Sequence, residues 1–119
     1  MSELAQIGVT ERNLICLDKL KESGLFDELQ DAARFAAAIA LREKLYVGKD
    51  LMNIGTKLNT RWNTSLLDPD NFFRRIIKNL NICPDDYGIG LRSLVILGLD
   101  YIFEKIKDKD YILIGDLIS

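Results

Sequence analysis

The sequence offers few side chains that could perform catalysis, because it contains no histidine. Histidine is the commonest general base and the commonest transition-metal ligand, so most hydrolase and metalloenzyme mechanisms are disfavoured. Catalysis by carboxylates alone would need acids that converge in a pocket, but the prominent acids stand beside prolines, where they suit helix starts. We interpret them as helix caps and first-turn acids, and predict no enzyme active site, metal site or cofactor; they are Asp68, Asp70, Asp85 and Asp86.

The two cysteines, Cys16 and Cys83, are far apart and lie among apolar residues. No histidine is present to activate either thiol, so neither is expected to act as a nucleophile. Two cysteines are too few for a disulfide-stapled secreted domain, and we predict that both are small core residues. Residues 1–10 lack a secretion signal and no stretch is apolar enough to cross a membrane, which predicts a cytoplasmic protein.

One group of basic residues could bind a ligand. The stretch between Asn71 and Leu80 carries three cations and no acid, and two more cations precede it. Lysine and arginine at this density can neutralise nucleic-acid phosphates. We predict as phosphate contacts on duplex DNA the residues Lys57, Arg61, Arg74, Arg75 and Lys78. The alternative is a solvated helix face that binds nothing.

The composition sets limits on this prediction. With 119 residues, 48% hydrophobic and 29% charged, the chain fits one domain that covers residues 1–119. Its net charge of −2 gives no attraction of the whole molecule to nucleic acid. DNA binding would therefore need a local basic patch or a surface assembled from several subunits.

The first half of the chain predicts two helices. Thr10 suits the N-cap of the first helix, and Gly24 can take the left-handed conformation that ends it. The second helix is expected from Asp27 to Tyr46, with Asp27 or Gln30 as its cap. It contains six alanines and is apolar almost all round, so it must be buried, within the chain or across a dimer.

The second half is less regular at first. Residues 47–68 contain several turn-forming residues that interrupt any apolar period. One alternative for this segment is a short helix over residues 49–58. Trp62 could lie in the core or in solvent. Helices are then expected to start at Asp68-Pro69-Asp70 and at Cys83-Pro84-Asp85-Asp86, the second running to Lys107. Gly98 inside that helix predicts a close crossing with the alanine-rich helix.

These elements predict an all-α fold, a compact bundle of four or five helices with an irregular middle segment and a hydrophobic C-terminal tail. The tail, residues 111–118, is too apolar for a free terminus, so we expect it to dock as a strand-like segment or to cross to a neighbouring subunit. Either the tail or the alanine-rich helix would then join subunits of a homo-oligomer.

Residues 10–46 resemble the helix pair of ribbon-helix-helix proteins. Residues 23–36 read Ser-Gly-Leu-Phe-Asp-Glu-Leu-Gln-Asp-Ala-Ala-Arg-Phe-Ala and follow a leucine-striped helix. That family places an alternating basic strand before the first helix and reads DNA with it, whereas residues 2–9 here contain no lysine or arginine. The family's DNA-reading residues therefore have no counterparts in this chain.

A longer stretch is similar to the DndE-like proteins of bacterial DNA phosphorothioation systems. The shared features are a Leu20-Lys21 to Gly24-Leu25 corner, an Arg34-Phe35-Ala36 helix, a Leu58-Asn59-Thr60-Arg61 stretch, a phenylalanine-rich helix and a last helix. This resemblance implies an oligomeric accessory protein that associates with DNA and has no catalytic machinery. Subunits in a ring could gather their basic faces on one side.

We therefore predict a non-enzymatic DNA-binding accessory protein of a DNA-modification or defence system, which acts as a homo-oligomer. The alternative is a protein-interaction or scaffolding subunit that makes no contact with nucleic acid. An apolar tail and an apolar helix would serve either function.

Overall fold

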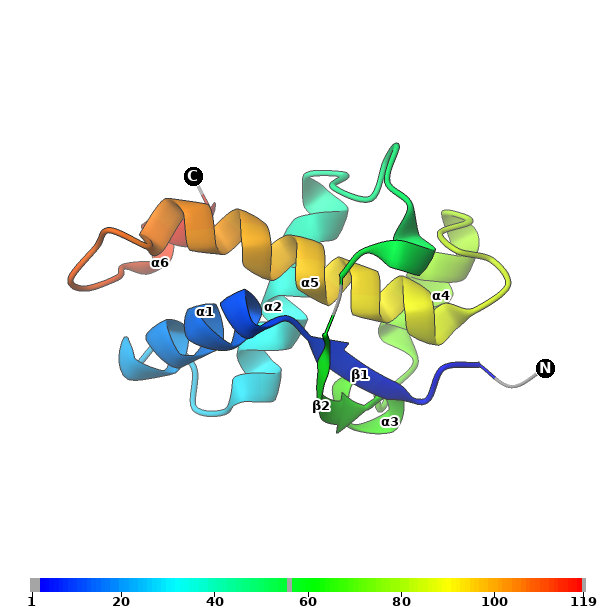
Figure 1. Ribbon diagram of the computed structural model, residues 1–119, viewed down its shortest axis with the longest axis horizontal. Coiled ribbons are helices and arrows are strands. Elements are labelled where there is room, and N and C mark those ends of the chain that lie inside the picture. The colour runs from blue at the N-terminus through cyan, green and yellow to red at the C-terminus, as the bar shows by residue number, and fades with distance from the viewer. Residues whose placement is uncertain (1–2, 56, 119) are drawn as a thin grey trace.

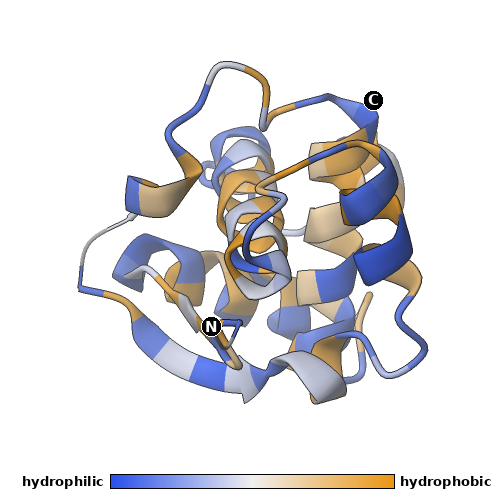
Figure 2. Cartoon of the chain, turned by 90° about the vertical axis from the view of Figure 1, so that its right-hand side faces the viewer, coloured by the Kyte–Doolittle hydropathy of each residue, from blue (hydrophilic) through white to orange (hydrophobic). Residues whose placement is uncertain are grey.

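The computed structural model describes residues 3–55 and 57–118, and its longest element is the helix α5 (Tyr87–Ile106). At 1.5 Å per residue α5 spans about 30 Å, and it runs along the long axis of the molecule (Figure 1). The helices α1 (Glu11–Glu22), α2 (Leu29–Arg42) and α4 (Phe72–Asn79) all pack against it. Viewed along the long axis, apolar residues are concentrated on the helices (Figure 2). The hydrophobic core is therefore built around α5.

The alanine-rich helix α2 crosses α5 at very short range. A Cβ atom added to Gly98 would lie 1.9 Å from the carbonyl oxygen of Ala36, a separation that no real side chain could occupy. Five of the six alanines of α2 are buried, and only Ala38 faces solvent. The predicted close crossing at Gly98 is confirmed, and it is made within one chain.

The first helix begins and ends as predicted. The hydroxyl of Thr10 accepts a hydrogen bond from the amide of Asn13 at 3.1 Å, and the side chain of Asn13 accepts one from the amide of Thr10 at 3.0 Å. Gly24 then has φ +82°, the left-handed conformation that lets the chain turn. The amide nitrogen Nδ2 of Asn13 also donates to Asp100 at 2.9 Å, which fastens α1 to α5.

The second helix is shorter than the predicted range from Asp27 to Tyr46. Its N-cap is Glu28, whose side chain makes no capping hydrogen bond, so neither Asp27 nor Gln30 is the cap. The helix ends at Arg42, and Lys44 takes the left-handed φ of 54°. The predicted range was too long because Leu45 and Tyr46 continue the apolar pattern of the helix, although the backbone already turns at Lys44.

The expected compact helical fold is confirmed in part: helices dominate residues 3–55 and 57–118, but two short strands form an antiparallel sheet, so the fold is not purely helical. β1 (Gln6–Val9) pairs with β2 (Asn59–Asn63), with Ile7 opposite Trp62 and Gly8 opposite Thr60. Ile7 and Trp62 are both buried, so Trp62 belongs to the core. β2 is mostly polar and its partner strand lies fifty or more residues earlier. Neither strand has the local alternation of apolar and polar residues that would reveal it.

The rest of the middle segment forms two short helical turns. A 3-10 turn, η1, covers Leu51–Asn53, in place of the helix considered over residues 49–58. The helix α3 (Thr64–Leu67) follows β2 directly, and the side chain of Asn63 caps it by accepting from the amide of Leu66 at 2.8 Å. The segment is thus irregular, as predicted, but it contains a strand.

Both proline-containing helix starts lie later in the chain than predicted. Asn71 donates to the carbonyl of Asp68 at 3.2 Å and Asp86 donates to the carbonyl of Cys83 at 3.1 Å, so each Asp/Pro stretch forms a turn. Proline suits the second position of such a turn as well as the first position of a helix. α4 then begins at Phe72 and α5 at Tyr87.

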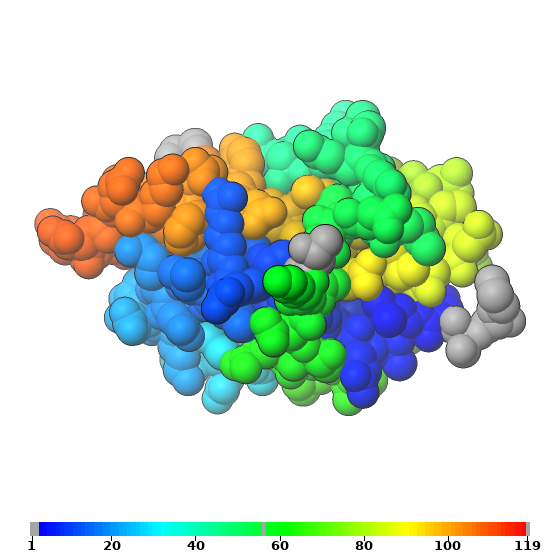
Figure 3. All heavy atoms as spheres, viewed as in Figure 1, coloured from blue at the N-terminus to red at the C-terminus, as the bar shows by residue number. Residues whose placement is uncertain are grey.

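The C-terminal tail is helical, not strand-like. The short helix α6 (Ile114–Ile118) follows a loop that projects from one end of the molecule (Figure 3). Ile112 and Leu117 are buried against the chain's own core, as docking requires. Other apolar side chains of the tail stay in solvent; they are Tyr111, Leu113, Ile114 and Ile118. Within residues 3–55 and 57–118 no helix, α5 included, has the length and hydropathy needed to cross a membrane.

We predict that Gly98→Ala strongly destabilises the fold. The added methyl group would overlap the carbonyl of Ala36, so α2 and α5 must move apart, at a cost of about 3 kcal/mol or more in the free energy of unfolding. Chemical denaturation measures this change. Gly115→Ala is the matched control, because nothing lies within 4 Å of its Cβ position; equal stability of the two variants would contradict the prediction.

Candidate nucleic-acid interface

The helix α4 presents three of the five predicted phosphate contacts. Its buried face carries Phe73 and Ile77, which pack into the core. Arg75 and Lys78 are exposed, and Arg74 is partly buried. Residues three positions apart are neighbours on a helix surface, so Arg75 and Lys78 form one pair of adjacent cations.

The structure places the other two predicted contacts on different elements. Arg61 is the extra residue of the bulge in β2, because Trp62 pairs with Ile7 and Thr60 with Gly8. Its side chain is exposed. Lys57 lines a separate open cavity together with Arg12 and Asp100. The predicted group is therefore divided over three places, and α4 holds the largest part.

A buried aspartate organises the start of α4. Asp68 is only 5% exposed, and its carboxylate accepts hydrogen bonds from the amides of Phe73 and Arg74, each at 3.0 Å. The hydroxyl of Tyr87 donates to the same carboxylate at 2.6 Å. Asp68 thus caps α4 as predicted, but from three residues before the N-cap Asn71, and it also joins α4 to α5.

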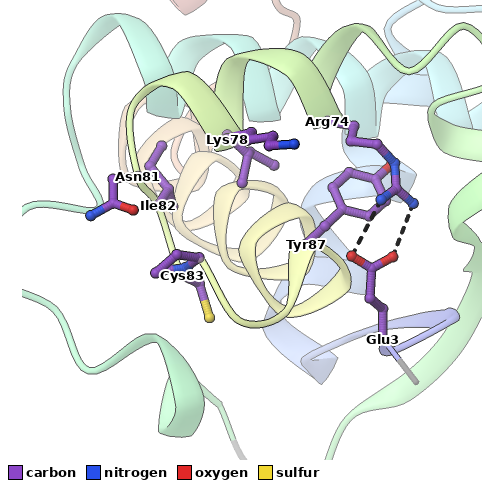
Figure 4. A pocket seen from close by; sticks show the side chains of 9 residues that line it. Glu3, Arg74, Lys78, Asn81, Ile82, Cys83 and Tyr87 are labelled. Atoms are coloured by element: carbon purple, nitrogen blue, oxygen red, sulfur yellow. Dashed lines mark hydrogen bonds and ion pairs between the residues drawn. The ribbon is translucent and has the colours of Figure 1, made fainter. Parts of the chain in front are cut away.

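Arg74 has a well-defined position. Its guanidinium group lies over the ring of Tyr87, 4.0 Å from the centroid. Two nitrogen atoms of that group face the two carboxylate oxygens of Glu3, at 3.0 and 3.2 Å. Its Nε donates to the side chain of Asn71 at 3.3 Å. Arg74 is therefore stacked on an aromatic ring and paired in a fork with a carboxylate (Figure 4).

A cavity of about 470 Å³ opens beside this pair. Arg74 and Lys78 line it from α4, Tyr87 from the start of α5, and Glu3 from the N-terminal segment (Figure 4). Cys83 contributes from the loop between the two helices. The cavity thus has two cations and one carboxylate on its walls.

The N-terminal segment is fixed beside this cavity by its backbone. The amide of Leu4 donates to both carboxylate oxygens of Asp86, at 2.9 and 3.1 Å. Asp86 also accepts from the amide of Ile89 at 3.2 Å, so of the two functions predicted for it, helix cap and first-turn acid, it has the first. The carbonyl of Leu4 lies against Gly88, where a Cβ atom would come within 1.9 Å of it. These contacts bring Glu3 to Arg74.

The thiols are poorly suited to nucleophilic chemistry. Burial raises the pKa of Cys16 to about 12, with the charge of Asp100 adding to the effect, and its Sγ donates to the carbonyl of Leu99 at 3.5 Å. Cys16 is a core residue, as predicted. Cys83 is only half-buried, which differs from the prediction, and partial burial and the nearby Asp86 raise its pKa. Neither thiol is disulfide-bonded.

The remaining acids do not gather into a metal site in the part of the chain that the structure describes. Asp70 and Asp85 are exposed and lie in the turns that precede α4 and α5, so the prediction that they are caps or first-turn acids is wrong. Each lies outside its helix because the helix starts after the proline turn.

The sequence interpretation missed the contribution of Glu3 and Tyr87 to the site. No function was predicted for either residue from the sequence. No local pattern connects positions 3, 68, 74 and 87, because their contacts depend on packing of the N-terminal segment, α4 and α5. The one available signal was the isolated tyrosine immediately after two aspartates.

Comparison of the chain with protein-family models, with curated proteins and with solved structures finds no match. The resemblances to DndE-like and ribbon-helix-helix proteins therefore remain predictions from the sequence.

We predict that Tyr87→Phe destabilises the protein. Burial and the hydrogen bond to Asp68 raise the pKa of the Tyr87 hydroxyl, so it stays a neutral donor, and its removal leaves a buried carboxylate with one partner fewer. We expect a loss of about 1–3 kcal/mol in the free energy of unfolding. Urea denaturation measures it, with Tyr111→Phe as the control because that side chain is 78% exposed. Identical midpoints for the two variants would show that the Tyr87 hydroxyl adds nothing.

Proposed function

We propose that this protein is a non-enzymatic DNA-binding accessory protein that contacts the phosphate backbone through α4. The observation that supports the proposal is the state of its arginines. Arg12, Arg34, Arg42 and Arg74 each form an ion pair within the chain. Arg75 has no acidic partner in the described part of the chain, and neither does its neighbour Lys78.

Unpaired cations on a helix are available to an external anion. Both side chains are exposed, so they remain hydrated and mobile and contribute little to the stability of the fold. Long basic side chains of this kind bind phosphates without reading sequence. Arg61 and Lys57, which also lack an ion-pair partner among residues 3–55 and 57–118, would add contacts on other parts of the surface.

The net charge of −2 makes an assembled surface more effective than a single subunit. Each subunit contributes two unpaired cations on α4, and a homo-oligomer would multiply them along one duplex. The resemblance to DndE-like proteins supports the same arrangement, and with it a role in DNA modification or defence.

We predict that Arg75→Ala combined with Lys78→Ala weakens binding to a short DNA duplex and reduces its salt dependence. Each lost phosphate contact lowers the slope of log K against log salt concentration by about 0.9, so the double variant should lose about 1.8. Fluorescence anisotropy over a salt series measures both quantities.

The matched control for this experiment is Lys19→Ala combined with Lys21→Ala. These lysines lie in the last turn of α1, far from α4 along the molecule, and their removal changes the net charge by the same amount (Figure 1). Equal losses of DNA affinity in the two double variants would show that binding depends on total charge and not on α4. Absence of any binding by the natural sequence at low salt would end the DNA proposal.

The second candidate function is a protein-interaction or scaffolding subunit, and the C-terminal tail favours it. Four of its large apolar side chains are in solvent, and such residues commonly mark contact sites. The alanine face of α2 is covered by α5, so only the tail remains of the two surfaces expected to join subunits. This surface serves self-association in the first proposal and a partner protein in the second.

We predict that Leu113→Ser combined with Ile114→Ser reduces the mass of the oligomer in solution. Both side chains are exposed, so the substitutions remove apolar contact area and leave the buried Ile112 and Leu117 in place. Light scattering coupled to size exclusion measures the mass. Val47→Ser combined with Met52→Ser is the control, since these apolar residues are also exposed, in the turn after α2 and in η1. An unchanged mass in the tail variant would exclude the tail from self-association.

A further inference from the structure

We propose that the guanidinium group of Arg74 is an anion site that Glu3 occupies within the chain, and that a DNA phosphate displaces Glu3 from it. This inference rests on the proposed phosphate binding by α4 and adds a competitor to that binding. Glu3 would thereby set how many cations of α4 are available to DNA.

The position of Arg74 suits recognition of an oxyanion. Its stacking on Tyr87 fixes the plane of the guanidinium group, and its Nε bond to Asn71 limits rotation. The two remaining nitrogens then point as a fork at one place in the cavity, where the two oxygens of Glu3 lie at 3.0 and 3.2 Å. A carboxylate and a phosphate present the same pair of oxygens to such a fork.

Glu3 is positioned by its backbone and weakly held by its side chain. The neighbouring Leu4 is fixed by Asp86 and Gly88, and this holds the carboxylate of Glu3 within reach of Arg74. The side chains of Arg74 and Glu3 are 43% and 42% exposed, and an exposed ion pair contributes little stability. Rotation of one glutamate side chain therefore frees the site without unfolding any element.

The cavity beside Arg74 can accept a displacing group. Lys78 lies one turn further along α4 and lines the same wall, so an anion that replaces Glu3 meets a second cation (Figure 4). Both cations contact the ligand from one helix, next to the exposed Arg75. A phosphate in this place would be continuous with the backbone contacts proposed for α4.

The experiment compares four proteins: the natural sequence, Glu3→Gln, Arg74→Gln and the double variant. Glutamine keeps the size of each side chain, and thermal unfolding verifies that all four are folded. Binding of a short DNA duplex is measured by fluorescence anisotropy over a salt series. Asp70→Asn is the matched control, because it removes one exposed acid near α4 that has no contact with Arg74.

With Arg74 present, Glu3→Gln should raise the affinity about two- to fivefold and steepen the salt slope by about 0.9. In the Arg74→Gln background the same change should have no effect, and Asp70→Asn should have less effect than Glu3→Gln. A gain from Glu3→Gln that persists without Arg74, or is matched by Asp70→Asn, would show general electrostatics and overturn the inference. If the Arg75→Ala, Lys78→Ala double variant loses DNA binding while substitutions of Glu3 and Arg74 leave the affinity unchanged, the inference is overturned and the proposed function stands.

A second measurement separates the anion site from DNA binding. Inorganic phosphate is titrated into Glu3→Gln and the natural protein, and the side-chain Nε–H resonance of Arg74 is followed by NMR. Saturation of the shift at a lower phosphate concentration in Glu3→Gln than in the natural protein supports competition at Arg74, even if neither protein binds DNA. No shift in either protein, together with no DNA binding, would overturn the anion site as well as the proposed function.

Discussion

The contact between the backbones of α2 and α5 is the constraint on which the rest of the structure depends. Gly98 and the alanines around Ala36 let the two helices approach until their backbones are in contact. At this range α5 is buried on most of its circumference, and α1, α4 and β1 can pack on the faces that remain. A larger residue on either side would separate the helices and open the core along its length, because interiors are close-packed and adjust poorly.

The start of α5 has a second function in the fold, because three segments meet there. Asp86 caps the helix and accepts a hydrogen bond from the amide of Leu4. The hydroxyl of Tyr87 donates to the carboxylate of Asp68, in the turn before α4. Each of these acids satisfies several donors at once, which is how buried or half-buried carboxylates remain stable. The same contacts carry Glu3 to Arg74. The proposed regulation of α4 is thus a consequence of how the N-terminal segment is held.

The distribution of charge explains why an acidic protein can still be proposed to bind DNA. Most arginines are used in ion pairs inside the chain, and their positive charge is cancelled locally. The charges left over on α4 have no partner, and an oligomer would bring several such helices together. The exposed apolar side chains of the tail provide the surface for that assembly or for a partner protein. The helix α4 and the tail lie at opposite ends of the molecule, so both can contact a partner together (Figure 1).

The sequence by itself determined the features that depend on neighbours within a few residues. The N-cap at Thr10 and the left-handed turn at Gly24 were predicted correctly, because capping and glycine conformation are local properties. The crossing at Gly98 was also predicted, because a glycine inside a helix indicates the close approach of another element even when that element is far away in the chain. The tertiary structure alone decided the pairing of β1 with β2, the helical form of the tail, and the division of the five basic residues. It also decided the assembly of Glu3, Asp68, Arg74 and Tyr87. Apart from the form of the tail, these features join positions that are far apart in the chain, and such contacts exist only once the helices have packed around α5.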